Sequence, residues 1–108
     1  KIIVSNVGNV DKKALQHSAE RLQNKLGEGA VVLGATLPGN KVSLVASFSK
    51  KIYKDKNLSA GKFIGEIAQI CEGGGGGRPN LAQAGGKDAS KLEEALLTAK
   101  NKLIQLLK

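Results

Sequence analysis

A run of glycines between residues 73 and 86 constrains the fold of this chain more than any other feature of its sequence. Residues 73–77 are all glycine, and seven of the sixteen residues from 72 to 87 are glycine. Each glycine loses extra backbone freedom on folding, so a segment of this kind is costly to order. We therefore expect a loop here, one that a partner or a close backbone contact requires.

The sequence before this run alternates between strand and helix patterns. Residues 2–7 form a mostly apolar run typical of a buried strand. A helical pattern follows between Asp11, which can cap the first backbone N–H groups, and Gly27, which can end the helix. The apolar face of that helix consists of Leu15, Ala19, Leu22 and Leu26.

Two strands and a second helix are predicted next. Residues 30–37 and 41–49 flank a Pro-Gly-Asn turn, which indicates an antiparallel hairpin. Val45 interrupts the polar face of the second of these strands, so we expect cover on both of its faces. Ser59 can cap the following helix, whose apolar face is formed by Phe63, Ile64, Ile67, Ala68 and Cys71.

A closing helix is predicted after the glycines. Ser90 and Glu93 have the spacing of a capping box. The apolar stripe consists of Leu92, Leu96, Ala99, Leu103 and Leu106. The expected order is strand, helix, two strands, helix, glycine-rich loop, helix, which indicates one small α/β domain over residues 1–108 with helices covering a mixed sheet. Because the chain opens abruptly in a strand, we expect this domain to be part of a longer protein.

The charge of the chain indicates its class of partner. Seventeen Lys and Arg against nine Asp and Glu give a formal charge of +8, which favours a polyanion, nucleic acid before any other. No apolar run approaches the roughly 20 residues of a membrane-spanning helix, so we expect no membrane partner. The single cysteine, Cys71, cannot form an internal disulfide, which favours the reducing cytoplasm.

The glycine-rich segment is the candidate binding site. Bare N–H groups can face an anion, a guanidinium can pair with phosphate or stack on a base, and amides can bind base edges or ribose. The residues are Gly73, Gly74, Gly75, Gly76, Gly77, Arg78, Asn80, Gln83 and Lys87. A turn in which backbones merely pack closely is the alternative. A basic segment beside these glycines can add phosphate contacts from its lysines and a stacking ring from its tyrosine. The alternative is that this segment is only a solvated loop. Its residues are Lys50, Lys51, Lys54, Lys56 and Tyr53.

No catalytic or metal-binding set can be assembled. His17 is the only histidine and has no companion ligands, so we interpret it as a surface residue. Cys71 lies on an apolar helix face, which favours a buried, inert thiol. Glu93 and Glu94 are adjacent and point differently, so they do not support acid–base catalysis.

One resemblance covers nearly the whole chain. Residues 73–86 read Gly-Gly-Gly-Gly-Gly-Arg-Pro-Asn-Leu-Ala-Gln-Ala-Gly-Gly, and this run resembles the signature of the C-terminal globular domain of alanyl-tRNA synthetase. The resemblance implies a parent alanine–tRNA ligase that uses ATP, magnesium and zinc elsewhere. It implies that this domain, without cofactor or catalytic centre, grips the outer corner of the tRNA for alanine and supports aminoacylation and editing. Asn80 departs from the pattern, because bacterial members often carry an acid there.

Three other functions are kept open. One is an oligomerisation module forming a weak homodimer through the closing helix. A second is the substrate-binding domain of a phosphoesterase with an Asp-His-His catalytic domain, although a histidine follows the glycine run in those relatives and Arg78 and Pro79 follow it here. A third is binding of single-stranded DNA.

Overall fold

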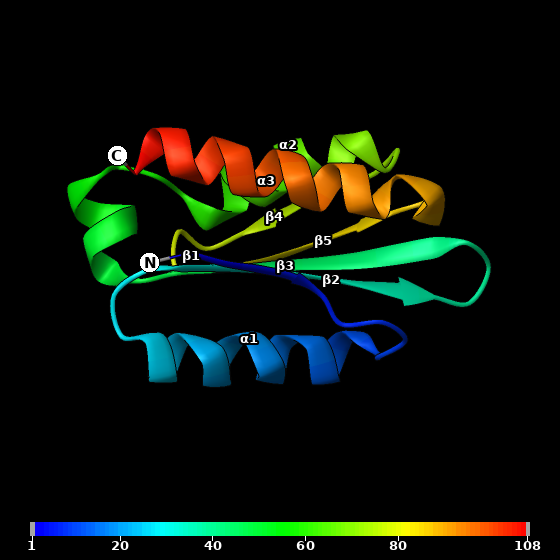
Figure 1. Cartoon of the computed structure of the whole chain (residues 1–108), viewed down its shortest axis with the longest axis horizontal. Coiled ribbons are helices and arrows are strands. Elements are labelled where there is room, and N and C mark those ends of the chain that lie inside the picture. Colours follow the sequence, from blue (N-terminus) through cyan, green and yellow to red (C-terminus); the bar gives the residue numbers. More distant parts are fainter. Residues whose placement is uncertain (1, 108) are drawn as a thin grey trace.

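A mixed sheet lies between one helix on one face and two helices on the other in the computed structural model, which describes residues 2–107 (Figure 1). The strands are β1 (Ile2–Asn6), β2 (Ala30–Leu37), β3 (Lys41–Phe48), β4 (Gly74–Gly77) and β5 (Leu81–Gly86). They lie in the order β1-β2-β3-β5-β4, with β1 parallel to β2 and the other neighbours antiparallel. Helix α1 (Lys12–Leu26) covers one face, and α2 (Ala60–Ile70) and α3 (Leu92–Leu106) cover the other. This arrangement confirms the predicted α/β class.

The signals read for the first helix are confirmed. The Asp11 side chain accepts a hydrogen bond of 2.7 Å from the Ala14 N–H. Gly27 ends α1 with φ of 76°, a left-handed conformation that favours glycine, and its N–H donates to the Gln23 carbonyl. Leu15 and Ala19 are fully buried against the face of β2 and β3 that α1 covers.

The larger core lies between the sheet and the pair α2 and α3. It is almost entirely aliphatic, and two aromatic rings within it, Phe48 and Phe63, pack with centroids 5.6 Å apart. The prediction that the strand containing Val45 is covered on both faces is confirmed, because Ser43 and Ser47 on the α1 side are buried as well. None of the helices in residues 2–107 is both long and apolar enough to cross a membrane.

The glycine-rich segment is a hairpin of two strands, β4 and β5, and the expectation of a loop is wrong for most of it. One reason is the close approach of α2 to β4, which needs bare Cα atoms on α2. A Cβ added to Gly61 of α2 would lie 2.6 Å from the carbonyl oxygen of Gly77, and one added to Gly65 would lie 2.9 Å from that of Gly75. Helix α2 therefore packs backbone to backbone on β4.

The start of the last helix also differs from the prediction. Asp88 caps a short 3-10 turn, η2 (Ala89–Lys91), by accepting from the Ser90 N–H and hydroxyl. Glu93 does not reach back to Ser90, because its carboxylate accepts from the Asn6 amide at 2.8 Å. The capping box is therefore wrong, and α3 begins at Leu92. Leu106, expected on the buried stripe, is 49% exposed.

Candidate nucleic-acid interface

The turn between β4 and β5 is held at one end of the sheet. The Asn80 carbonyl accepts from the Phe48 N–H and the Pro79 carbonyl accepts from the Ala60 N–H, both at 2.9 Å. Arg78 closes the turn by donating its N–H to the Leu81 carbonyl at 3.1 Å. The exposed side chains of Arg78 and Asn80 are thus displayed between the end of β3 and the start of α2.

A groove runs between this hairpin and α1, because α1 packs on β2 and β3 and leaves the hairpin side of the sheet open. Its larger part is a hollow of about 390 Å³. This hollow is lined by Gln16, Glu20, Gly76, Gly77, Arg78, Leu81, Ala82 and Gln83. A second hollow of about 200 Å³ adjoins it through Glu20 and Leu81 and includes Asn80. We call the two hollows together the α1–hairpin groove.

Polar side chains of the groove are fixed from both walls. The Gln83 side chain donates to the Lys12 carbonyl at 3.4 Å, and the Ser47 hydroxyl donates to the Gln23 side chain at 3.1 Å. Nothing in the sequence marks Gln16, Glu20 or Gln23 as site residues, because only the packing of α1 brings them to the hairpin. Among the predicted residues, the structure brings Gly76, Gly77, Arg78, Asn80 and Gln83 together here.

The remaining residues of the predicted loop lie elsewhere. Gly73, Gly74, Gly75 and Lys87 line neither hollow of the groove. Gly86 pairs with Val42 at the opposite end of β3, and the following Lys87 donates its N–H to the Cys71 carbonyl at 2.8 Å. The length of β5 separates Lys87 from Arg78 by roughly 17 Å or more. The structure therefore does not bring Lys87 together with the turn.

The lysine segment follows β3 directly, close to the hairpin turn. It includes η1 (Lys51–Asp55), a single π-helical turn, and its lysines are exposed: Lys50, Lys51, Lys54 and Lys56. Lys51 Nζ lies 3.6 Å from the Glu28 carboxylate, an exposed ion pair that contributes little to stability. Tyr53 is half-buried and packs against the larger core, so its ring is not freely displayed for stacking.

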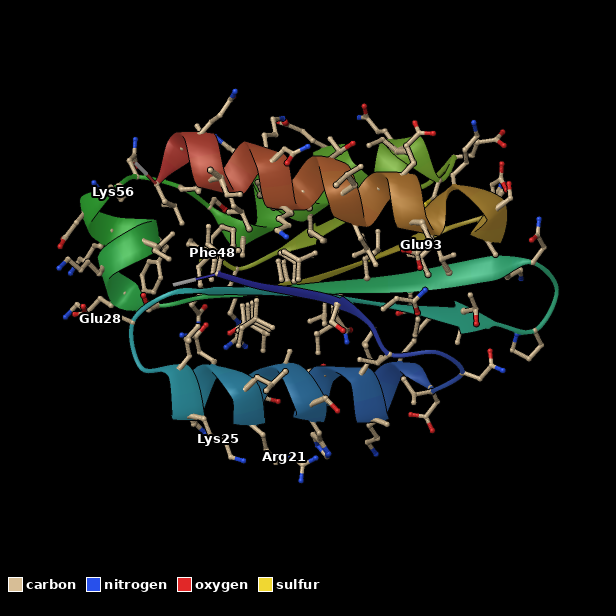
Figure 2. The ribbon with its side chains drawn as sticks, viewed as in Figure 1. Arg21, Lys25, Glu28, Phe48, Lys56 and Glu93 are labelled. Carbon is tan, nitrogen blue, oxygen red and sulfur yellow. The ribbon has the colours of Figure 1, made fainter. Side chains whose placement is uncertain are left out.

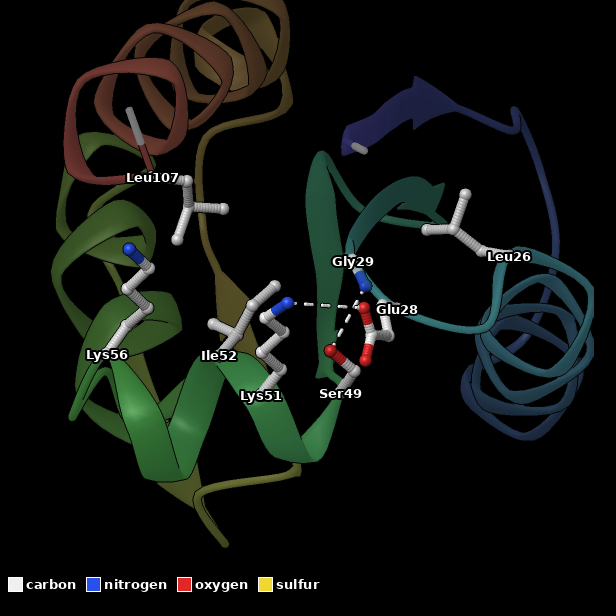
Figure 3. A pocket seen from close by; sticks show the side chains of 8 residues that line it. All are labelled: Leu26, Glu28, Gly29, Ser49, Lys51, Ile52, Lys56 and Leu107. Carbon is white, nitrogen blue, oxygen red and sulfur yellow. Dashed lines mark hydrogen bonds and ion pairs between the residues drawn. The ribbon is translucent and has the colours of Figure 1, made fainter.

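A further hollow, of about 490 Å³, opens beside the lysine segment at the ends of α1 and α3 (Figure 3). Leu26, Ile52 and Leu107 give it apolar walls, while Lys51 and Lys56 supply charge. Figure 3 shows the Lys51–Glu28 ion pair spanning it, beside the Ser49 hydroxyl that accepts from the Gly29 N–H at 3.0 Å. Sequence reasoning missed this hollow, because its walls come from three separate segments of the chain.

The remaining candidates for chemistry are the metal-ligating side chains and the single thiol. No cluster of three or more His, Cys, Asp or Glu side chains that could hold a metal ion occurs there. His17 is exposed on α1, as predicted. Cys71 is fully buried, as also predicted, and burial raises the pKa of its thiol, with smaller contributions from the negative charges of Asp88 and Glu94. What the domain offers is a polar groove and a neighbouring basic segment on a small, positively charged scaffold.

Comparison with known proteins identifies the class of this domain. The model of the DHHA1 domain matches residues 1–105. The chain is 67% identical over its whole length to an alanine–tRNA ligase of Crocosphaera subtropica, and 68% identical over 98% of its length to one of Picosynechococcus sp.. It spans 12% of the length of each of these relatives.

A solved structure narrows the class further. The C-Ala domain of Aquifex aeolicus alanyl-tRNA synthetase superposes with a TM-score of 0.82 at 30% identity, covering 94% of this chain and 89% of that one. The chain therefore belongs to the DHHA1 family, among the C-terminal domains of alanyl-tRNA synthetases.

Proposed function

We propose that this chain is the tRNA-binding part of an alanine–tRNA ligase and that it grips the outer corner of the tRNA. The observation that carries the proposal is the meeting of the groove and the lysine segment at one end of a domain of charge +8. The names of the relatives support the choice of ligase and of tRNA. ATP, magnesium and zinc would act in other parts of the whole protein, and its location would be cytoplasmic.

The mechanism follows from the two kinds of contact that the surface offers. The exposed Lys50, Lys54 and Lys56 can neutralise phosphates with little dependence on base sequence. Arg78 and the amides of the groove can contact bases or riboses next to them, which adds shape and sequence preference. Held in this way, the tRNA would remain attached while its acceptor end moves between the aminoacylation and editing sites.

A titration of this chain with three RNAs tests the proposal. They are the tRNA for alanine, an acceptor-stem hairpin without the elbow, and an unstructured RNA of equal length, each at two salt concentrations. We expect the full tRNA to bind most tightly and Arg78→Ala to weaken it about tenfold through loss of charge-assisted hydrogen bonds. Arg21→Ala is the matched control, because Arg21 projects from α1 away from the sheet (Figure 2).

Equal affinity for the three RNAs would exclude recognition of the elbow. A single-stranded DNA of the same length is included in the same titration. If it binds as tightly as the tRNA, the domain is a general single-strand binder instead.

Self-association is the second candidate function, and the surface of α3 favours it. Leu97 is 60% exposed and Ile104 is 42% exposed, and their spacing of seven residues places them on the same side of the helix. Sedimentation at two protein concentrations, with and without Leu97→Ser, separates the candidates. A tight dimer without RNA affinity supports the oligomerisation module.

A further inference from the structure

Packing within the chain requires glycine at some positions of β4 but not at others. A Cβ on Gly75 would lie 2.5 Å from the Ala84 Cα, and one on Gly77 would lie 2.9 Å from the Ala82 Cα. A Cβ on Gly76 would meet nothing nearer than 3.9 Å, and one on Gly74 nothing within 4 Å. Neither Gly74 nor Gly76 has a left-handed φ that would favour glycine. The bare Cα of Gly76, which lines the α1–hairpin groove, therefore has no explanation in the fold itself.

The shape of the larger hollow suits a flat group. Gly76, Gly77 and Ala82 give one side of it almost no side chain, so a ring can approach the backbone closely. Its volume of about 390 Å³ falls in the range of small-molecule sites, roughly 300–1,000 Å³. Gln16 and Glu20 of α1 form the opposite wall.

The α1 wall of the hollow carries the Glu20 carboxylate and is unfavourable for a phosphate, whereas Arg78 on the hairpin supplies a positive charge at the rim. The Glu20 carboxylate forms no ion pair within residues 2–107, although the domain carries a formal charge of +8. A phosphate beside Glu20 would be repelled by a like charge. Gln83 donates one of its two side-chain N–H hydrogens to the Lys12 carbonyl, and its side-chain oxygen remains free to accept. Away from Arg78, the hollow therefore offers the Glu20 carboxylate and the Gln83 side-chain oxygen as acceptors, and these suit a neutral ring that presents N–H donors.

Guanine is the base whose Watson–Crick edge carries two neighbouring N–H donors, at N1 and at the exocyclic N2, and one carboxylate can accept both. We propose that the α1–hairpin groove holds an unpaired guanine of the bound RNA. Glu20 accepts from its N1 and N2 hydrogens, the bare Cα of Gly76 leaves room for its ring, and Arg78 binds a phosphate at the rim. This inference rests on the proposed RNA-binding function and names the base that the site selects.

The variant Glu20→Gln gives the first test, because it changes the affinity for RNA in opposite directions depending on the role of Glu20. If Glu20 is merely a surface charge, Glu20→Gln removes repulsion and tightens binding of a polyanion. If Glu20 accepts from guanine, the same change weakens binding of the alanine tRNA about tenfold, through loss of a charged hydrogen-bond acceptor. Glu94→Gln is the matched control on α3, across the sheet from α1, and it leaves affinity unchanged or slightly tighter.

Alanine substitutions in the glycine run give the second test. Gly74→Ala places a methyl group in open space, and Gly76→Ala places one at an ordinary contact distance of 3.9 Å from the Gly61 carbonyl oxygen, so both variants keep the fold. Only Gly76→Ala narrows the hollow, and we expect it to weaken tRNA binding more than Gly74→Ala does. Circular dichroism and urea unfolding of both variants establish that their folds are equal.

The base itself is tested with three single-stranded hexanucleotides that compete with the tRNA. One carries a single guanine among uridines, one carries inosine at that place, and one is uridine throughout. We expect guanine to compete best and inosine, which lacks the N2 amino group, to lose roughly three- to tenfold. The guanine site is overturned if the three hexanucleotides compete equally well. It is also overturned if Glu20→Gln tightens tRNA binding, as removal of any negative charge would. In both cases tRNA binding itself stands. If the unchanged chain binds no RNA, the proposed function fails as well.

Discussion

At the scale of the residue, Cys71 links burial to a measurable pH dependence. Burial raises the pKa of its thiol above the ordinary value of about 9. Below that pH the thiol is protonated in the folded and unfolded chains alike, so its ionisation takes nothing from the free energy of unfolding. At higher pH the unfolded chain releases the proton first. The free energy of unfolding then falls by up to about 1.4 kcal/mol per pH unit until the folded thiol ionises too.

Cys71→Ala isolates this effect. Urea unfolding of the original chain and of the variant is measured between pH 7 and pH 10. Above about pH 9 the free energy of unfolding of the original chain should fall relative to that of the variant. Every other ionisable group is common to the two proteins, so its contribution cancels in the difference. A difference that stays constant over the whole range would contradict a raised pKa at Cys71.

The contact of α2 with β4 leads to a prediction at the scale of the element. Alanine is a better helix former than glycine by about 1 kcal/mol, so Gly61→Ala would ordinarily stabilise a helix. Here the new Cβ would lie 2.6 Å from a backbone oxygen that no rotamer change can move. We expect Gly61→Ala to lower the free energy of unfolding by roughly 1–3 kcal/mol, as overpacking does. Urea unfolding measures this, with Gly74→Ala as the control in open space, and a stabilised Gly61→Ala would refute the packing.

The cap of η2 gives another prediction at this scale. Asp88→Ala removes the acceptor of the Ser90 N–H and should cost about 1 kcal/mol, the usual cost of losing an N-cap. Ser90→Ala keeps that N–H bond to Asp88 and should cost less. Thermal unfolding of the two variants compares them, and an equal or larger loss in Ser90→Ala would restore the capping box as the better description.

These elements show which features the sequence predicts and which it does not. Helix α1 was predictable because Asp11, Gly27 and the spacing of Leu15 and Ala19 act within a few residues of one another. The β4–β5 hairpin was not, because its glycines meet Ala82 and Ala84 of β5 and Gly61 and Gly65 of α2 only in the folded chain. The same limit applies to the groove. The chemistry of Arg78 and Gln83 is visible in the sequence, whereas the approach of Glu20 depends on where α1 packs.

At the scale of the whole molecule, one end of the sheet concentrates the candidate surface. The hairpin turn hydrogen-bonds to Phe48, two residues before the lysine segment begins, while Lys87 lies at the far end of β5. The domain is 38 Å long, so an RNA helix lying across the turn end need not reach Lys87. The proposed function therefore requires the lysine segment but not Lys87, although all of these are lysines in the sequence.

Salt dependence converts this asymmetry into a measurement. Each phosphate contact that is lost reduces the slope of log affinity against log salt by roughly 0.7–0.9. We expect the variant Lys50→Ala, Lys54→Ala, Lys56→Ala to reduce the slope for the alanine tRNA by up to roughly 2–3, and Lys87→Ala to leave it nearly unchanged. Lys13→Ala, Lys41→Ala, Lys100→Ala removes the same charge from three other elements. If that control lowers the slope equally, the net charge of the domain governs binding and the turn end has no special part in it. If only the variant of the lysine segment lowers the slope, the phosphates lie beside the groove, and a neighbouring base lies within reach of Arg78.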